Sequence, residues 1–433
     1  MKRYIVSLMT MVAVAGLQAQ SLSLSLQDCR RMALENNEKV KVANNDVDKA
    51  KLDRQIAFAQ YLPKVDGSIT GLHMQNQNVL GMSLQTRGTY LAGINVTLPV
   101  YTGGQLTAAN RLAEIGQHVS EEQLRKARMQ VIADVDNTYY TLISVRSKVK
   151  MLEAYARQMQ ELYDRVKLSV RVEMATENDL LRIATKQNEI SYQLQKACNG
   201  EQLCQLALAN VIGTDFEQYI TPTDTILQSA ISSGLREDFS SRPDLLLLQQ
   251  NVKASEVMVK KARANYLPTV ALVGSYGHYD NLKLKGAIQN LDGTPIHVNH
   301  TLRGGNPYAL LTVSVPIFHW GAELKKVKKA KIDLYDSQLQ LQQYERGMRI
   351  EVRQAVLNIT DGQRMVETAT VGQKQADENL RVMRQKYDNQ LCTMTDLLDA
   401  QSQWQQARSN LIEAQTQLKI YETEYLRVTG RLE

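Results

Sequence analysis

The chain has 433 residues, of which 51 are Lys or Arg and 45 are Asp or Glu, so its formal net charge is +6. This mild positive excess is too small to indicate a nucleic-acid-binding protein. The four cysteines form no C-x-x-C motif, and Cys198 and Cys204 would lie about 9 Å apart along one predicted helix, beyond disulfide reach. We therefore expect no disulfide framework, with Cys204 in a helix seam and Cys29 and Cys392 unpaired.

The first 19 residues have the pattern of a secretory signal peptide. Lys2 and Arg3 form a basic start, residues 4–16 are mostly apolar, and Ala19 is a small residue at the expected cleavage point. The alternative is a buried N-terminal helix, which the polar segment that follows disfavours. No later stretch is apolar over about 18 residues, so the sequence predicts no transmembrane helix.

The next elements in the chain are a helix over 26–61, a strand pair over 64–98 and a long helical hairpin over 105–213 with a turn near 172–176. Apolar residues spaced three and four apart form one seam on each limb of the hairpin, which indicates a left-handed coiled coil. The seam residues are Leu142, Val145, Val149, Leu152, Ala156, Met159, Tyr163, Val166 and Val170 on the first limb, and Leu180, Ile183, Gln187, Ile190, Leu194, Ala197, Glu201, Cys204, Leu208 and Val211 on the second.

The second half of the chain repeats this order. Four short sequences recur in the same order, and the last three share one offset, for example 313 − 96 = 217 residues. The pairs are Tyr61-Leu62-Pro63 with Tyr266-Leu267-Pro268, Val96–Tyr101 with Val313–Phe318, Asp179-Leu180-Leu181 with Asp396-Leu397-Leu398, and Val211-Ile212-Gly213 with Val428-Thr429-Gly430.

These pairs predict an internal duplication, with a first repeat over 20–213 and a second over 242–433, joined by an equatorial linker over 214–241. The second repeat is expected to contain a helix over 242–266, a strand pair over 269–317 and a helical hairpin over 321–430, in which a long helix over 321–389 is followed by a return helix over 395–429. In each repeat two short helices match the length of one long helix. The second strand pair is longer, which predicts a longer outer loop near Leu284–Asn306.

The four predicted strands have the length and alternation of strands that cross an outer membrane. Each has about ten residues in which apolar and polar positions alternate. Aromatic residues lie near their ends, as in an interfacial girdle: Tyr61, Tyr90, Tyr101, Tyr266, Tyr279, Phe318 and Trp320. The alternative is a soluble antiparallel sheet. Four strands cannot close a membrane barrel, so several chains would have to share one; three chains would give twelve strands.

These motifs together resemble the outer membrane efflux proteins of the TolC-like family, over nearly the whole mature chain. They are Y-L-P before each strand pair, V-x-x-P-[VI]-[YF] after it, R-P-D at 242–244, and D-L-L-D-A-Q at 396–401 after Tyr387. The resemblance implies an α+β membrane protein: a long α-helical coiled-coil barrel plus four transmembrane β-strands per chain, with a 12-stranded β-barrel shared by a homotrimer.

The resemblance also implies function and location. The protein would be a passive exit duct of a tripartite efflux pump in the cell outer membrane, with its helical tunnel in the periplasm, exporting small molecules such as drugs. Its partners would be a periplasmic adaptor, an inner membrane pump and outer membrane lipid, with no nucleic acid and no cofactor. The alternatives are an outer membrane component of a type I protein secretion system, or a non-pore secreted coiled-coil scaffold.

The resemblance places the periplasmic entrance on Asp179, Tyr387, Asp396 and Asp399. It places the adaptor-contacting turns on Glu173, Met174, Gln390 and Leu391; Glu173 and Gln390 stand where the family has a turn glycine, and Cys392 stands where members can carry a basic residue. The residues themselves offer a second reading, because Thr176-x-x-Asp179 and Thr393-x-x-Asp396 are capping boxes that begin helices. Capping does not account for Asp399, whose counterpart in the first repeat is Arg182.

No motif for catalysis or for a cofactor is present. The sequence has no Walker A, G-x-S-x-G or H-E-x-x-H motif, and no G-x-G-x-x-G after a predicted strand. His297-x-x-His300 is a weak metal signal in a predicted polar loop. We therefore expect no enzyme and no metal site.

Overall fold

The computed structural model describes residues 22–79, 82–86, 88–214, 220–224, 234–289, 292 and 294–433. The predicted signal peptide lies outside the described residues, as do 215–219 and 225–233 of the predicted linker. The chain divides into two compact units. Unit 1 comprises residues up to 44, 123–245 and 345–433, and unit 2 comprises 45–122 and 246–344.

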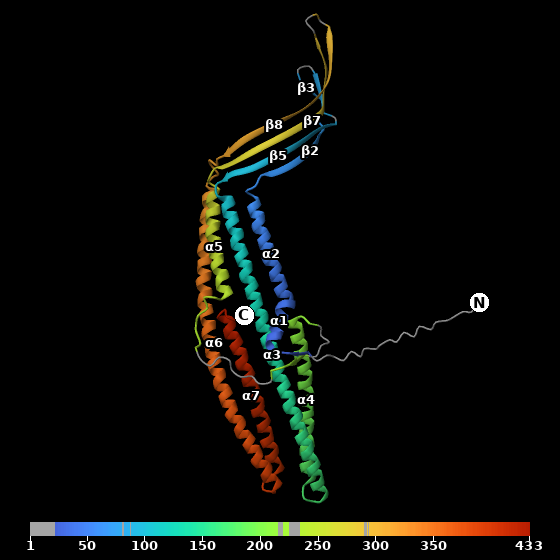
Figure 1. Ribbon diagram of the computed structural model, residues 1–433, viewed down its shortest axis with the longest axis vertical. Coiled ribbons are helices and arrows are strands. Elements are labelled where there is room, and N and C mark those ends of the chain that lie inside the picture. The colour runs from blue at the N-terminus through green and yellow to red at the C-terminus, as the bar shows by residue number, and fades with distance from the viewer. Residues whose placement is uncertain are drawn as a thin grey trace, which may run out of the picture. The chain divides into compact units, whose positions relative to one another are not determined.

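Seven helices are found among the described residues (Figure 1). The helices α3 and α6 are each 67 residues long, and the other five have between 11 and 36 residues. The bounds are α1 Leu26–Asn36, α2 Glu38–Ala59, α3 Gln105–Arg171, α4 Glu177–Ile212, α5 Pro243–Ala264, α6 Ala322–Asp388 and α7 Met394–Val428. The predicted ends of the hairpin helices α3, α4, α6 and α7 agree with these bounds to within about two residues, because turns and N-caps mark them in the sequence.

The predicted helix over 26–61 is wrong in one respect, because it is two helices. Asn37 separates α1 from α2 with an extended backbone, φ −64° and ψ 129°. Its side-chain amide donates to the carbonyl oxygen of Val211 at 3.0 Å, and its side-chain oxygen accepts from the backbone N–H of Lys39 at 2.9 Å. The break is thus held by a contact with α4 that no local pattern predicts.

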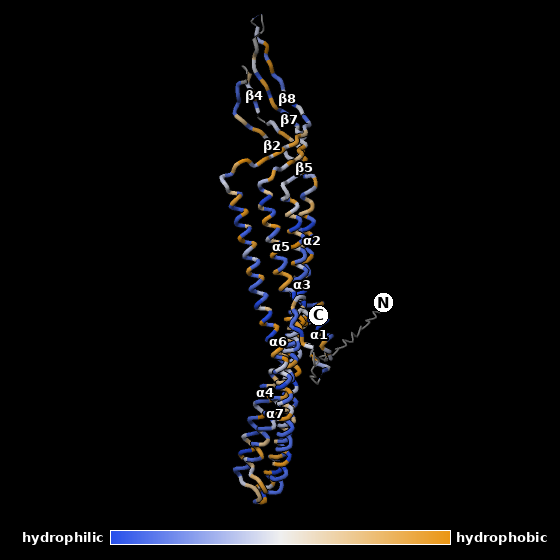
Figure 2. Tube along the Cα trace, turned by 90° about the vertical axis from the view of Figure 1, so that its left-hand side faces the viewer, coloured by the Kyte–Doolittle hydropathy of each residue, from blue (hydrophilic) through white to orange (hydrophobic). Residues whose placement is uncertain are grey.

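Unit 1 contains α4, α7, the parts of α3 and α6 from residues 123 and 345 onward, and a small sheet. In this sheet β1 (Leu22–Leu24) and β6 (Ile220–Pro222) pair in parallel. A strand in the predicted linker was not expected, because three residues are too few to show a period. Along both hairpins the hydrophobic residues recur at intervals, as Figure 2 shows by colour.

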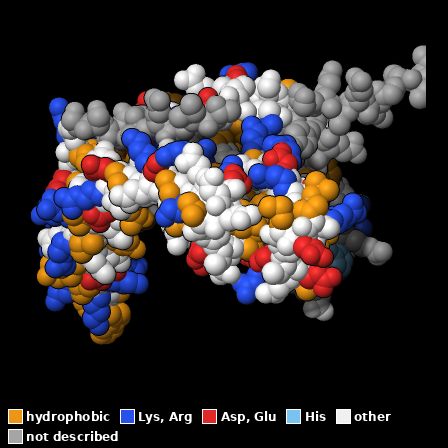
Figure 3. Space-filling view, turned by 90° about the horizontal axis from the view of Figure 1, so that it is seen from below, with side chains coloured by type: hydrophobic (Ala, Val, Ile, Leu, Met, Phe, Trp, Pro, Cys, Tyr) orange, Lys and Arg blue, Asp and Glu red, His pale blue; other side chains and the backbone are white. Residues whose placement is uncertain are grey.

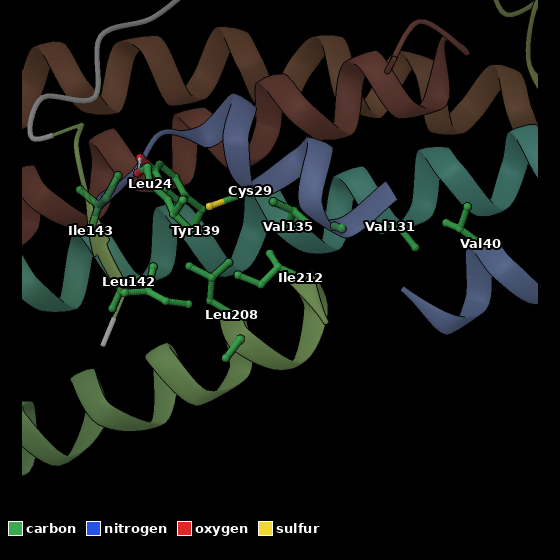
Figure 4. Packing of buried hydrophobic residues seen from close by; sticks show 13 residues of the cluster. Leu24, Cys29, Val40, Val131, Val135, Tyr139, Leu142, Ile143, Leu208 and Ile212 are labelled. Atoms are coloured by element: carbon green, nitrogen blue, oxygen red, sulfur yellow. Dashed lines mark hydrogen bonds between the residues drawn. The ribbon is translucent and has the colours of Figure 1, made fainter. Parts of the chain in front are cut away.

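The main core of unit 1 lies where α1, α3 and α4 meet. Tyr139, Leu142, Leu208 and Ile212 are fully buried there, and Cys29 points into the same cluster (Figure 4). Burial raises the pKa of the Cys29 thiol to about 12, so this cysteine is an inert core residue. All four cysteines are free thiols.

A buried ion pair crosses this core. The Arg30 guanidinium on α1 donates to both carboxylate oxygens of Asp136 on α3, at 2.7 and 2.5 Å, and the Asp136 side chain is wholly buried. The hydroxyl of Thr423 on α7 donates to the same carboxylate at 2.8 Å. Three helices are therefore tied together through one carboxylate.

Unit 2 contains a six-stranded antiparallel sheet. The sheet runs β2-β5-β7-β8, and the hairpin β3–β4 pairs with β7 beyond the end of β5. The strands are β2 Lys64–Leu72, β3 Gln77–Val79, β4 Met82–Gln85, β5 Thr89–Thr102, β7 Thr269–Gln289 and β8 Pro295–Ser314.

Two expectations about these strands are wrong. The predicted outer loop near Leu284–Asn306 is mostly strand, because β7 and β8 continue as one long ladder. His297 and His300 accordingly lie on β8 rather than in a loop. The fourth strand ends at Ser314 and does not reach Ile317, since Pro316 has no N–H to donate to a ladder. The hairpin β3–β4 is an addition to the four strands that the sequence predicts.

Candidate functional site

The sheet of unit 2 has one apolar and one polar face, which the strand register defines. We name as the apolar face the side on which Ile69, Ile94 and Leu272 lie; the large residues there are strongly exposed, with Ile69 83% exposed. Its members are Val65, Ile69, Ile94, Val96, Leu98, Val270, Leu272, Tyr276, Leu311 and Val313. The polar face carries Asp66, Ser68, Thr70, Asn95, Thr97, Ser275 and Thr312, with Leu91, Val273, Tyr308 and Leu310 among its apolar or aromatic exceptions.

A β-bulge adjusts the apolar face at the end of the sheet nearest the helices. Pro99 pairs with Ala271 and Tyr101 with Val270, so Val100 is an extra residue in β5. The bulge turns Tyr101 onto the apolar face. Tyr90 lies on this face at the other end of β5, whereas Tyr279 lies on the polar face, against its predicted role in the girdle. Phe318 and Trp320, 68% and 86% exposed, lie just after β8 with their ring centroids 5.1 Å apart and their planes tilted by 58°.

The second candidate region comprises the two hairpin tips, residues 169–179 and 386–399. Each tip begins with a Schellman turn. The backbone N–H of Met174 donates to Ser169 O at 2.8 Å and that of Glu173 to Val170 O at 3.1 Å; Leu391 and Gln390 make the same two bonds in the other hairpin. Glu173 and Gln390 adopt φ of 59° and 62°, in the left-handed region that favours glycine. Both turns therefore place a non-glycine residue in a backbone conformation that favours glycine.

Substitution of Glu173 tests this strained turn. Because a side chain in the left-handed region costs about 1 kcal/mol, Glu173→Gly is expected to slow hydrogen exchange at the Met174 amide by about fivefold. Glu173→Val is expected to speed it, since a β-branched residue tolerates this conformation worst. Exchange measured on the folded protein reports the local opening; faster exchange in the glycine variant would show that the turn is not strained.

Asp179 and Asp396 both serve as capping residues. The Asp179 carboxylate accepts from the Thr176 hydroxyl at 2.7 Å and from its backbone N–H at 3.2 Å, and the Thr176 hydroxyl accepts from the Asp179 N–H. Thr393 and Asp396 make the same box. The hydrogen bonds from Thr393 hold the pKa of Asp396 below its usual value. Their capping role, one of the two readings from sequence, is therefore real.

The two hairpins face each other across a cavity at the tips. It has a volume of about 650 Å³ and contains Tyr387, Asp179 and Cys392 among its lining residues. Burial, and then the nearby Asp179 carboxylate, raise the pKa of the Tyr387 hydroxyl. The hairpins also share one hydrophobic cluster, which includes Tyr155, Met159, Ile183 and Leu397 and reaches the cavity through Leu162 and Val166. The predicted residues Asp179 and Tyr387 are thus brought together at the cavity, whereas Asp396 is not among its lining residues and lies in the first turn of α7, three residues after the N-cap Thr393.

Asp399 stands apart from these contacts. It is exposed on α7 and takes part in none of the hydrogen bonds or ion pairs found among the described residues. Its counterpart Arg182 donates from its guanidinium to the Thr395 hydroxyl at 2.6 Å, which links α4 to α7.

A further cross-hairpin contact joins Arg165 and Asp388 at 3.7 Å. The repeat offset of 217 residues matches Asp388 with Arg171 and not with Arg165, so no pattern in the sequence predicts this pair. Seen from below, basic, acidic and hydrophobic side chains are intermixed on the visible face (Figure 3).

Within the described part of the chain, no three His, Cys, Asp or Glu side chains gather closely enough to bind a metal ion. None of the helices there combines the length and the hydrophobicity that crossing a membrane requires.

Comparison with known proteins assigns the family. The model of the outer membrane efflux protein family matches residues 29–212 and 236–431. Among curated relatives, the solvent efflux pump outer membrane protein SrpC of Pseudomonas putida is 22% identical over 405 residues, covering 88% of this chain and 80% of SrpC. The proteases secretion protein PrtF of Dickeya chrysanthemi is 20% identical over 432 residues, covering 95% of this chain and 89% of PrtF.

Solved structures share the fold. The outer membrane protein VceC of Vibrio cholerae matches with a TM-score of 0.76 at 15% identity, over 94% of this chain and 96% of VceC. Because the family model covers most of the sequence, the chain belongs to the outer membrane efflux protein family. This is a family of efflux channels and not of enzymes; the protein is located in the cell outer membrane, with its helical part in the periplasm.

Proposed function

We propose that the protein is the passive exit duct of a tripartite pump that exports small molecules such as drugs. In this proposal three copies share a 12-stranded barrel, to which each contributes β2, β5, β7 and β8. A periplasmic adaptor connects the helices to an inner membrane pump, which supplies the energy. The two sequence repeats, 20–213 and 242–433 with the linker 214–241 between them, would give each copy two similar helical hairpins around the lumen.

The apolar face of the sheet carries this proposal. Ile69, Ile94 and Leu311 are exposed on the apolar face, whereas the other face is mostly polar. Exposed residues of this size fit contact with lipid rather than with water. The edges β2 and β8 would be left with unpaired backbone groups in lipid, which is costly unless neighbouring copies pair with them.

Deletion of the gene in the source bacterium tests whether the exported cargo is a small molecule or a protein. We expect the deletion strain to accumulate fluorescent drugs and dyes, and to recover when the intact gene is returned. Unchanged dye accumulation together with loss of a secreted protein would contradict drug efflux.

That outcome would favour the second candidate, a type I secretion component. The observation in its favour is the similarity to PrtF along 95% of the chain, since PrtF is named for protease secretion. The similarity to SrpC, named for solvent efflux, is slightly higher in identity, 22% against 20%. Both candidates use the same duct and differ in the pump attached to it.

The hairpin tips would form the periplasmic entrance. In a trimer, Asp179, Tyr387, Asp396 and Asp399 would each occur three times around the axis. The proposal is supported by the cavity that brings Tyr387 and Asp179 together and by the free exposed carboxylate of Asp399. The Schellman turns, with Glu173, Met174, Gln390 and Leu391, would contact the adaptor.

Asp399→Ala tests the entrance ring without disturbing a helix cap. A carboxylate about 10 Å from the axis attracts a cation by about 0.4 kcal/mol in water, and three attract it by about 1.2 kcal/mol. Loss of all three is therefore expected to lower the K⁺ over Cl⁻ permeability ratio by roughly eightfold. The readout is the reversal potential in a salt gradient. Asp361→Ala is the matched control, because Asp361 is exposed on α6 about 40 Å before the tip. An equal ratio in both variants would remove Asp399 from the entrance.

A further inference from the structure

A second β-bulge interrupts the ladder between β7 and β8. Tyr279 pairs with Gly304, and the next pair is Leu282 with Leu302. Two residues of β7, Asp280 and Asn281, therefore oppose a single residue of β8, Arg303. Beyond the bulge lies a segment that we name the outer extension: β3, β4, residues 282–289 of β7 and residues 295–302 of β8.

The bulge is held in place by side chains. Asn281 has a φ of 61°. Its side-chain amide donates to the backbone oxygen of Gly88 at 3.0 Å, and its backbone carbonyl oxygen accepts from the Thr89 hydroxyl at 2.9 Å. The Asp280 carboxylate accepts from the Tyr90 hydroxyl at 3.1 Å and from the Asn281 N–H at 2.7 Å. These contacts join the bulge to the turn between β4 and β5, so it is a fixed feature of the sheet.

An extra residue in one strand reverses which side chains face each side of the sheet. On β8, which has no extra residue, even-numbered residues stay on the polar face, so Leu302 and Val298 lie on that side with their β7 partners Leu282 and Gly286. Arg303, Lys283 and Lys285 take the opposite side, which continues the apolar face. The face is thus apolar up to Tyr90 and becomes basic beyond the bulge.

The basic residues lie at the height of lipid headgroups. From Leu98 to Tyr90 the apolar face spans about 27 Å along β5, or about 21 Å across a membrane for a strand tilted by about 40°. Lys283 lies two ladder positions past the bulge, about 5 Å higher at this tilt, and Lys285 lies four positions past it, about 10 Å higher, from where its long side chain reaches back to the headgroups. Headgroups occupy roughly 5–7 Å on each side of the hydrocarbon core. The helices join the other end of the sheet, so this end faces the cell exterior.

The charges on this surface are of one sign apart from Asp280. Lys285 and Arg303 are exposed and Lys283 is half-buried. Among the described residues, none of the ion pairs involves these three side chains. The Asp280 carboxylate accepts hydrogen bonds from the Tyr90 hydroxyl and the Asn281 amide, and the nearby charges of His278 and Arg303 also act on it. His278 and His297 lie on the same side. The surface therefore complements a negatively charged group that lies at the outer edge of the membrane.

We propose that Lys283, Lys285 and Arg303 bind the phosphate groups of outer-leaflet glycolipids, and so fix the height of the barrel in the membrane. This proposal rests on the proposed function, because it requires the apolar face to contact lipid. The occupant is a phosphorylated lipid and not a free anion, since the three side chains stand directly above an apolar surface that would contact acyl chains.

Binding of rough-type lipopolysaccharide to the purified full-length protein in nanodiscs tests the proposal. The variant K283Q/K285Q/R303Q removes the three charges. The variant K325Q/K328Q/K329Q is the matched control, because it removes three exposed charges from α6. Each Lys or Arg near an anionic membrane surface contributes about 1 kcal/mol of binding free energy. The variant K283Q/K285Q/R303Q is therefore expected to bind lipopolysaccharide roughly 100-fold more weakly than the wild type. The control variant is expected to bind like the wild type, and lipopolysaccharide stripped of phosphate is expected to bind weakly to all three proteins.

Conductance of the same samples separates the two proposals. If the wild type conducts but the three substitutions do not change lipopolysaccharide binding, this inference is overturned and the proposed duct function stands. Inorganic phosphate that binds as tightly as the lipid also overturns it. A wild type that neither inserts nor binds overturns both. If the triple variant does not fold, the double variant K283Q/K285Q is measured in its place. Its lipopolysaccharide binding is expected to be at least tenfold weaker than that of the wild type.

Discussion

Ile94→Arg is expected to keep the protein out of the membrane. Ile94 lies midway along β5 on the apolar face and is 54% exposed. An arginine on the lipid side near the midplane costs about 2–4 kcal/mol per copy, and a trimer would carry three. The yield of heat-resistant trimer in outer membrane fractions is expected to fall at least tenfold.

Ser68→Arg is the matched control for this prediction. Ser68 pairs with Gly93, next to Ile94, but it lies on the polar face. The same new side chain would therefore point into the lumen, where it is hydrated. We expect normal insertion and a lower preference for cations in single-channel recordings. Equal loss of insertion in both variants would mean that the two faces of the sheet do not differ in environment.

Asp136→Ala is expected to destabilise unit 1 more than any single surface substitution. The change removes both charge-assisted bonds from Arg30 and the bond from Thr423. It also leaves a guanidinium whose side chain is only 25% exposed without its partner. Breaking a buried pair in this way costs about 3–5 kcal/mol. The measurement is the denaturant dependence of the helical circular dichroism signal in detergent.

The neighbouring Asp134 provides the control. Its carboxylate lies 3.6 Å from the Lys39 ammonium and its side chain is 32% exposed. Solvent screening limits such a pair to about 1 kcal/mol or less, so Asp134→Ala is expected to shift the midpoint only slightly. If the two variants unfold at the same denaturant concentration, the buried pair does not tie α1, α3 and α7 together.

The parts of the fold that could be predicted are those with local signals. Thr176 and Thr393 mark the starts of α4 and α7 because each forms a capping box with an aspartate three residues later. The alternation in β2 and β5 likewise predicted which side chains share a face, and the register confirms it for Val65 and Ile94.

The parts that could not be predicted depend on contacts between distant residues. The break at Asn37 needs the carbonyl of Val211, and β1 and β6 are too short to show a period. The ladder over 284–306 was expected to be a loop because the second strand pair is longer than the first, and a difference in length does not show whether the extra residues form a loop or extend the strands.

The features of the candidate entrance also separate into those with a local sequence signal and those that depend on contacts between distant residues. Capping by Asp179 and Asp396 follows from spacing alone. The cavity with Tyr387 and the pair of Arg165 with Asp388 depend on how two hairpins pack. Their role in gating stays a prediction, since it concerns three copies around one axis.

Single-channel recording of the mature protein in a planar bilayer, with the mass of the same sample measured in detergent, tests the central claim most directly. The proposed duct predicts a particle of three chains and a small, cation-selective conductance that increases in Asp396→Ala/Asp399→Ala. A well-folded helical protein that gives no current, or that is a single chain in detergent, would contradict it.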